Sequence, residues 1–163
     1  MTVLSNANLQ GMKTMILESN LYINTDDIPW TPWVIPGMYF KMLNYEGERC
    51  SLLVKMDKGI TLAMHRHLEP VEFFLLEGSF GYVDDETGEE YLVRKMGYLF
   101  EPPGTVHRPI TPDGCVGFSV LHGKIQGFDA DGNSIELGTP EYLRRAEANN
   151  ALGHLKQKAQ IAA

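Results

Sequence analysis

Two histidines separated by one residue, His65 and His67, lie in the largely apolar run of residues 59–78. If this run is a β-strand, both side chains point to the same face, because side chains alternate along a strand. They then stand roughly 7 Å apart along the strand, and two imidazoles at that distance can tilt toward one ion. A pair of this kind is more often exposed or structural, so it needs a partner elsewhere in the chain to indicate a site.

That partner is a third histidine, His107, which follows a second apolar stretch and the turn at 102–104. Three neutral imidazoles brought together from separate strands are typical of a divalent transition-metal site. We therefore predict that His65, His67 and His107 are metal ligands. Glu72 is the candidate fourth ligand, because a carboxylate among inward-facing apolar residues is costly unless it is paired or bound to a metal.

Glu101 stands six residues before His107, at a place where an apolar residue would serve packing better. Two interpretations remain open. It is either a surface carboxylate on a mixed strand, or a catalytic group that orients a ligand histidine or holds a proton of the substrate. His122 and His154 lie outside both stretches and are expected to be structural or exposed, and Arg66 is expected to face away from the site.

Short apolar runs bounded by turn residues predict an all-β protein, an antiparallel sandwich or barrel. The predicted strands are 38–45, 49–56, 60–67, 71–77, 80–83, 90–95, 98–101, 116–122, 124–128 and 134–137. One helix is expected near the C-terminus. Thr139 would cap it, Pro140 would occupy its first position, and it would run to about Asn150.

Length and composition favour a single soluble domain that does not act on nucleic acids. The chain has 163 residues, and 14 basic against 21 acidic side chains give a formal net charge of -7. No basic cluster offsets this charge, which argues against nucleic acids and anionic membranes as partners. Neither a signal peptide nor an apolar run of about 20 residues is visible, so we expect a cytoplasmic protein. Cys50 and Cys115 are isolated and are expected to be buried free thiols.

The two histidine-containing stretches resemble the two motifs of the cupin superfamily. The first runs Gly59, five residues, His65-x-His67, four residues, Glu72, five residues, Gly78, one residue shorter at its end than usual. The second runs from Gly97 to His107. It also departs from the usual spacing, and Thr111 stands where the motif has asparagine. The resemblance implies a cupin double-stranded β-helix, a jelly-roll barrel, over residues 38–138. Residues 1–37 would form an arm on the barrel or in a dimer interface, and residues 139–163 a C-terminal helix and tail.

Within the cupins, the chain resembles small dioxygenases such as acetylacetone dioxygenase and dihydroxyacetophenone dioxygenase. The similarity covers the spacing around Glu72, the spacing from Glu101 to His107, and the downstream run of residues 121–133. It implies iron held by three histidines, with Glu72 not required as a ligand. The expected cofactor is therefore Fe(II), with Zn, Mn or Ni as alternatives. A weaker resemblance, around His65 and His67, is to the cupin domain of zinc-binding anti-sigma factors.

These features predict a dioxygenase that cleaves a carbon–carbon bond of a small β-diketone or hydroxyketone. Three neutral imidazoles leave a divalent ion at +2, and such an ion favours the chelating enolate of a diketone. Tyr39, Phe74 and Phe118 are candidate walls of the substrate pocket. Two rival functions remain: a non-enzymatic sensor that binds zinc or a small molecule, and a metal-dependent isomerase or decarboxylase. A homodimer or higher homo-oligomer is expected.

Overall fold

In the part of the chain that the structure describes, a series of strands is followed by a helix near the C-terminus. The computed structural model describes residues 21–84, 86–128 and 131–155. A short 3-10 turn, η1 (Thr25–Asp27), precedes the first strand. The strands are β1 (Thr31–Pro32), β2 (Met38–Glu46), β3 (Arg49–Met56), β4 (Ile60–Thr61), β5 (His65–His67), β6 (Val71–Val83), β7 (Glu90–Arg94), β8 (Tyr98–Glu101), β9 (Val106–His107), β10 (Pro109–Thr111), β11 (Cys115–Leu121), β12 (Ile125–Phe128) and β13 (Ser134–Leu137), and the helix is α2 (Thr139–Ala148).

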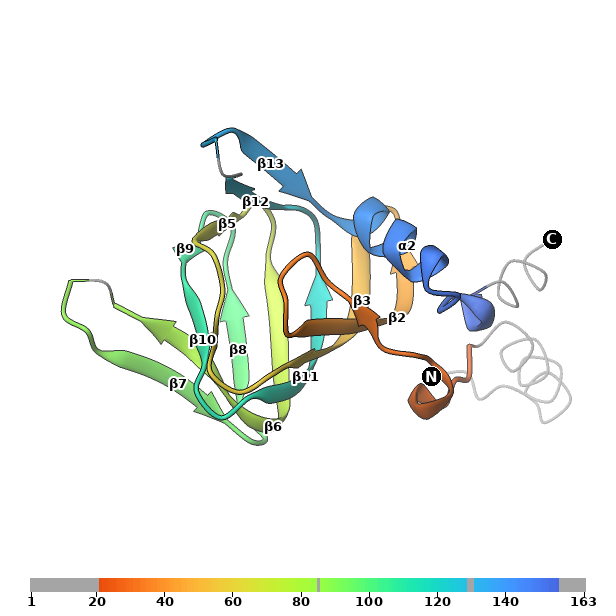
Figure 1. Ribbon diagram of the computed structural model, residues 1–163, viewed down its shortest axis with the longest axis horizontal. Coiled ribbons are helices and arrows are strands. Elements are labelled where there is room, and N and C mark those ends of the chain that lie inside the picture. The colour runs from red at the N-terminus through yellow and green to blue at the C-terminus, as the bar shows by residue number, and fades with distance from the viewer. Residues whose placement is uncertain (1–20, 85, 129–130, 156–163) are drawn as a thin grey trace, which may run out of the picture.

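The strands form two antiparallel sheets that curl around a common interior (Figure 1). The larger sheet has the order β1-β2-β3-β11-β6-β10-β4, with β7 and β8 also paired to β6. The smaller sheet has the order β13-β12-β5-β9. The long strand β6 joins the two halves of the larger sheet, because its first half pairs with β8 and its second half with β7 and β10. The all-β jelly-roll prediction is confirmed.

Three of the predicted strands differ from the structure in ways that matter for the site. The run predicted as one strand over 60–67 is two strands, β4 and β5, which belong to different sheets. The runs predicted as separate strands over 71–77 and 80–83 are one strand, β6, which continues through Gly78 at a φ of +79°. The very short strands β1, β9 and β10 were not predicted, because two or three residues carry no periodicity.

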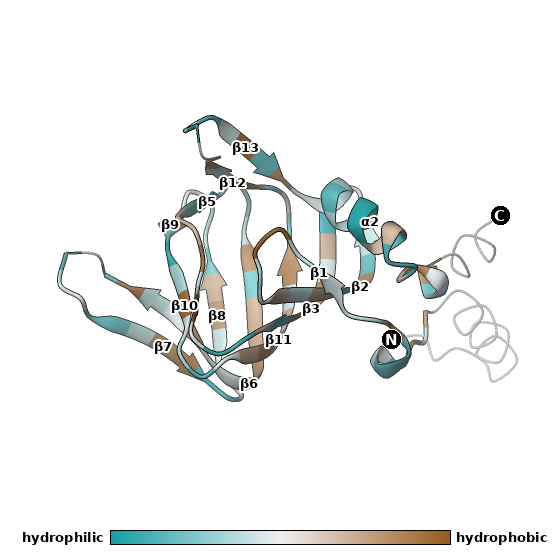
Figure 2. Cartoon of the chain, viewed as in Figure 1, coloured by the Kyte–Doolittle hydropathy of each residue, from teal (hydrophilic) through white to brown (hydrophobic). Residues whose placement is uncertain are grey.

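The core follows the alternation of the strands. In β3 the side chains of Leu52, Val54 and Met56 are buried, whereas those between them are half-buried. Figure 2 shows apolar residues recurring along the barrel strands and polar ones on α2. Trp33 covers one end of this core. Its ring stacks on Tyr142 of α2 with centroids 3.9 Å apart and packs edge-on against Phe40.

Helix α2 begins differently from the prediction. Its N-cap is Gly138, which makes no side-chain capping hydrogen bond. Thr139 lies inside the helix, and its buried hydroxyl donates to the carbonyl oxygen of Glu48 at 2.6 Å, so it ties the helix to the turn between β2 and β3. Pro140 lies in the first turn, as predicted. Residues 12–18, a largely apolar run that could form a strand, fall outside the described residues. Among those described, no helix is long and apolar enough to cross a membrane.

Candidate metal centre

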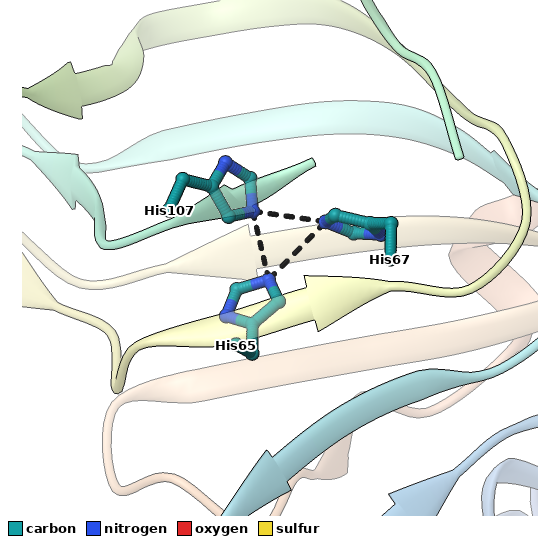
Figure 3. Close-up of side chains that lie close together, drawn as sticks. All are labelled: His65, His67 and His107. Atoms are coloured by element: carbon teal, nitrogen blue, oxygen red, sulfur yellow. Dashed lines mark hydrogen bonds between the residues drawn. The ribbon is translucent and has the colours of Figure 1, made fainter. Parts of the chain in front are cut away.

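The three predicted histidines meet at one point in the barrel. His65 and His67 come from β5 and point to the same side, and His107 comes from the neighbouring strand β9, where it is the direct cross-strand partner of His65. Their Nε2 atoms converge (Figure 3), with separations of 3.2 Å between His65 and His67 and 2.9 Å from His107 to each. His67 and His107 are buried and His65 is half-buried.

All three imidazoles are held in the neutral form. Burial lowers the pKa of His67 to about 4 and that of His107 to about 3, and neighbouring histidines add to the effect. Burial also lowers the pKa of His65, whose Nδ1 donates to the carbonyl oxygen of Ala63 at 2.9 Å. With its proton on Nδ1, His65 presents a lone pair on Nε2 to the other two rings. Within the described residues, the buried Nδ1 atoms of His67 and His107 make no hydrogen bond, although an oxygen of Glu101 lies 3.3 Å from that of His107.

This arrangement fits a divalent metal ion. Three nitrogens about 2.1 Å from one ion lie about 3.0 Å apart at bond angles near 90°, and about 3.4 Å apart at the tetrahedral angle. The observed separations of 2.9–3.2 Å lie nearer the first value. Among the described residues, these histidines are the one group of three or more such side chains that could hold a metal. The cluster is therefore a candidate metal centre with three protein nitrogens on one side of the ion.

Glu101 is buried beside the histidines, so it is not the surface carboxylate that the sequence left open. Its Oε2 lies 3.3 Å from Nε2 of His67, and its Oε1 lies 3.3 Å from Nδ1 of His107. Burial raises the pKa of Glu101 to about 7, although a hydrogen bond from Tyr82 opposes the rise. A carboxyl group with this pKa can hold or release a proton near neutral pH.

Tyr82 is the residue that sequence reasoning missed. Its hydroxyl donates to Oε1 of Glu101 at 2.6 Å, and its ring lies 4.7 Å from that of His107. Its pKa is raised by burial and by the charge of Glu101. The sequence offers no motif for Tyr82, because it reaches the site only through the bend of β6 after Gly78.

The structure contradicts Glu72 as a metal ligand. In the first part of β6 the buried residues are Val71, Phe73 and Leu75, so Glu72 faces outward, where its side chain is 42% exposed. Its carboxylate accepts hydrogen bonds from Nε2 of His122 at 3.1 Å and from the Tyr98 hydroxyl at 2.9 Å. These bonds, from His122 first, lower the pKa of Glu72.

The inward carboxylate comes from another strand instead. Val71 occupies the inward position on β6, and its cross-strand partner on β8 is Glu101. The motif glutamate, Glu72, follows His67 after four residues and lies on the outer face of β6. The site receives its carboxyl group from Glu101 instead.

A cavity of about 280 Å³ opens beside the histidines and is mainly apolar. Its inner wall includes Leu52, Phe73 and Leu121, and its outer part includes Val34, Met64, Phe128 and Ile135. The predicted walls Tyr39, Phe74 and Phe118 are not among the lining residues. Each of them pairs across the sheet with another outward-facing residue, which places all three on the outer face of the sheet.

Comparison with known families agrees with this geometry. The family model described as the ChrR cupin-like domain matches residues 18–126, which include the three histidines and Glu101. Comparison with curated protein sequences finds no match.

Several solved structures share the fold. An acetylacetone dioxygenase from Acinetobacter johnsonii superposes with a TM-score of 0.67 at 20% identity, covering 79% of this chain and 91% of that chain. A Methylibium petroleiphilum PM1 protein, provisionally assigned as an acetylacetone dioxygenase, gives 0.68 at 20% identity, with coverage of 77% and 92%. An RmlC-like cupin from Ralstonia eutropha JMP134 gives 0.66 at 17% identity, with coverage of 80% and 87%. At these identities the likeness shows the fold.

Proposed function

The chain belongs to the ChrR cupin-like domain family, and on that premise we propose that it is an Fe(II)-dependent dioxygenase of small β-diketones or hydroxyketones. The observation that carries the proposal is the convergence of three neutral imidazoles next to an apolar cavity, with a buried carboxyl group at their edge. A ferrous ion held there would be chelated by the two oxygens of the substrate's enolate and would supply electrons to dioxygen. The names of two of the structural neighbours support this reaction class.

Three side chains would hold the metal, and a fourth would handle the proton. His65, His67 and His107 offer Nε2 atoms and carry no charge, so the ion keeps its full charge toward an anionic substrate. Oε1 of Glu101 is engaged by Tyr82, which leaves Oε2, on the side of His67, free to take a proton. A diketone loses the proton between its carbonyl groups on forming the enolate, and we assign that proton to Glu101.

The cavity favours a substrate whose remaining parts are apolar. Apart from the metal centre and Ser119, nearly all of the wall is hydrocarbon, so a further charged group on the substrate would lose its hydration without a partner. Alkyl or aryl substituents on the two carbonyl groups would instead be favoured by burial.

The test is oxygen uptake by the iron-loaded protein across a panel of diketones and hydroxyketones. We expect uptake that depends on substrate, carbon–carbon cleavage products, and one atom from isotopically labelled dioxygen in each fragment. Protein loaded with zinc should show little or no uptake, since zinc has no redox chemistry. Turnover that proceeds equally well without oxygen would contradict the proposal and indicate the isomerase or decarboxylase class.

A non-enzymatic sensor is the second candidate, because three imidazoles are also good ligands for zinc. The two candidates differ in what the metal does. A sensor should bind zinc tightly and give no oxygen uptake with iron across the whole panel. It should also change its stability or assembly on binding zinc or a small ligand, which thermal unfolding with and without zinc would detect.

The cysteines support a proposal about the compartment. Cys50 and Cys115 are both buried and unpaired, and burial raises the pKa of each thiol. Free thiols of this kind suit a reducing environment. We therefore propose that the protein acts in the cytoplasm.

A further inference from the structure

The outer face of the larger sheet carries a continuous group of exposed apolar side chains. We call this group the aromatic face, and its residues are Leu53, Phe74, Tyr98, Phe100, Val116 and Phe118. They lie on four neighbouring strands, β3, β11, β6 and β8, and Phe118 stands in register with Leu53 on one side and Phe74 on the other. Phe74 in turn pairs with Tyr98. Phe118, Phe100 and Tyr98 are 37%, 52% and 54% exposed.

Single exposed apolar residues are ordinary, but a contiguous patch of this kind marks an interaction surface. Helix α2 packs on β1 and β2 and leaves the patch bare. The segment around Trp30 covers only the β2 side, where its ring lies beneath the ammonium groups of Lys41 and Lys55. Among the described residues, neither α2 nor the Trp30 segment covers the aromatic face at β3, β11, β6 and β8.

Its polar groups are arranged so that a partner can cover the face with little loss of free energy from desolvation. The carboxylate of Glu72, between Phe74 and Phe100, already accepts hydrogen bonds from His122 and Tyr98. A carboxylate that keeps its partners loses less on desolvation than an unpaired one.

Two opposite charges that lie in one row across the face suggest which partner fits. Lys55 on β3 and Glu77 on β6 are the two cross-strand partners of Val116 on β11. They therefore lie in one row, one on each side of the central strand. A twofold axis parallel to β11 that packs two such faces together places β3 of one copy over β6 of the other. It brings Lys55 opposite Glu77 of the partner subunit, twice per dimer, and Phe118 opposite Phe118 of the partner subunit.

We propose that the aromatic face is the interface at which a second copy of this chain docks, about a twofold axis parallel to β11. Face-to-face packing of two sheets with nearly aligned strands is a common arrangement. Four strand widths of about 4.8 Å and seven residues of about 3.3 Å give a flat face of roughly 440 Å². Side-chain relief adds to this area, so it is of the order of the about 800 Å² per partner in a standard interface.

The test uses the full chain in sedimentation velocity and light scattering. We expect the wild type to form a dimer of 18.3 kDa subunits. Phe118→Glu, at the centre of the face, should weaken dimerisation about 30-fold or more. Tyr91→Glu is the matched control, because Tyr91 is 55% exposed on β7, outside the aromatic face, and dimerisation should not change.

Exchanging the two charges tests the orientation of the two copies and separates the loss of an ion pair from the loss of folding. Lys55→Glu and Glu77→Lys should each weaken the dimer, because each places like charges opposite one another. The double variant should recover most of the affinity, which a merely misfolded Lys55→Glu chain would not do. Exchanging Lys58 and Glu90, which lie outside the face, should have no effect.

Three results would overturn the proposal. One is a wild-type chain that remains monomeric at high concentration, which would assign the face to another occupant such as residues 1–20. Another is a dimer unaffected by Phe118→Glu. The third is a double charge variant no tighter than the single variants, which would exclude this twofold axis. The assay needs no substrate or iron, so its outcome is independent of the proposed reaction.

Discussion

At the scale of single residues, the site differs from its motif in where the carboxyl group comes from. The motif glutamate, Glu72, faces solvent with His122 and Tyr98, and Glu101 supplies the buried carboxyl group next to His67 and His107. Side-chain parity explains the exchange, because Val71 and Phe73 are the inward residues of β6 at this level.

Metal content should therefore respond to the histidines and not to Glu72. His107→Ala should lose most of the bound metal, because His107 contributes one of three ligands and lies 2.9 Å from both others. Glu72→Gln and His122→Ala should retain metal near the wild-type level. Elemental analysis of protein purified in parallel measures this. Full metal content in His107→Ala, or its loss in Glu72→Gln, would contradict the assignment.

Glu101 and Tyr82 should affect turnover without removing the metal. Glu101→Gln keeps the shape of the side chain but cannot take a proton, so we expect kcat to fall by about 100-fold or more. Tyr82→Phe removes the hydrogen bond that holds the Glu101 pKa down, so the activity profile should move to higher pH. The measurements are iron content and the pH dependence of kcat. An unchanged pH profile in Tyr82→Phe would show that the hydroxyl does not act through Glu101.

At the scale of elements, the sequence predicted most strands because they alternate between buried and exposed residues over six or more positions, as in β3. It also predicted that the three histidines come together, since each lies in a motif with its own spacing. It could not predict that β6 continues through Gly78, because the glycine reads as a strand break. The approach of Tyr82 depends on that continuous strand, and the direction of Glu72 depends on the alternation in its first part. They are consequences of sheet pairing that no local pattern contains.

Gly78 should be the most sensitive glycine of the barrel strands. It has a φ of +79°, and a Cβ there would meet the carbonyl oxygen of Gly114. Gly88 has a similar φ of +73° in an exposed turn, with nothing within 4 Å of an added Cβ. We expect Gly88→Ala to cost about 1–2 kcal/mol from backbone strain alone, and Gly78→Ala to cost more than about 3 kcal/mol. Urea unfolding of the two variants measures the difference, and equal losses would show that the close approach to Gly114 is relieved at little cost.

At the scale of the whole molecule, the barrel buries three neutral imidazoles and one carboxyl group whose pKa is raised. The free energy of unfolding must therefore depend on pH. His67 and His107 have folded pKa values of about 4 and about 3, against 6.5 in the unfolded chain. As pH falls below 6.5, the unfolded chain binds protons that the folded chain does not, so the histidines lower the stability. Glu101 acts in the opposite direction between pH 7 and 4.5, because its folded pKa of about 7 lies above its unfolded value of 4.5.

The metal-free protein should therefore lose stability as the pH falls from 6.5 to 4.5, and Glu101→Gln should lose it faster. With two protons taken up by unfolded histidines and one by folded Glu101, the net loss is about 1.4 kcal/mol per pH unit. His65, whose pKa is also lowered, adds to the loss. In Glu101→Gln the compensating proton is gone, so the slope should rise by about 1.4 kcal/mol per pH unit. Urea unfolding of both proteins at several pH values between 5 and 7 measures the slopes. Equal slopes would mean that Glu101 titrates at its ordinary pKa, and a flat wild-type profile would mean that the histidines are not buried in neutral form.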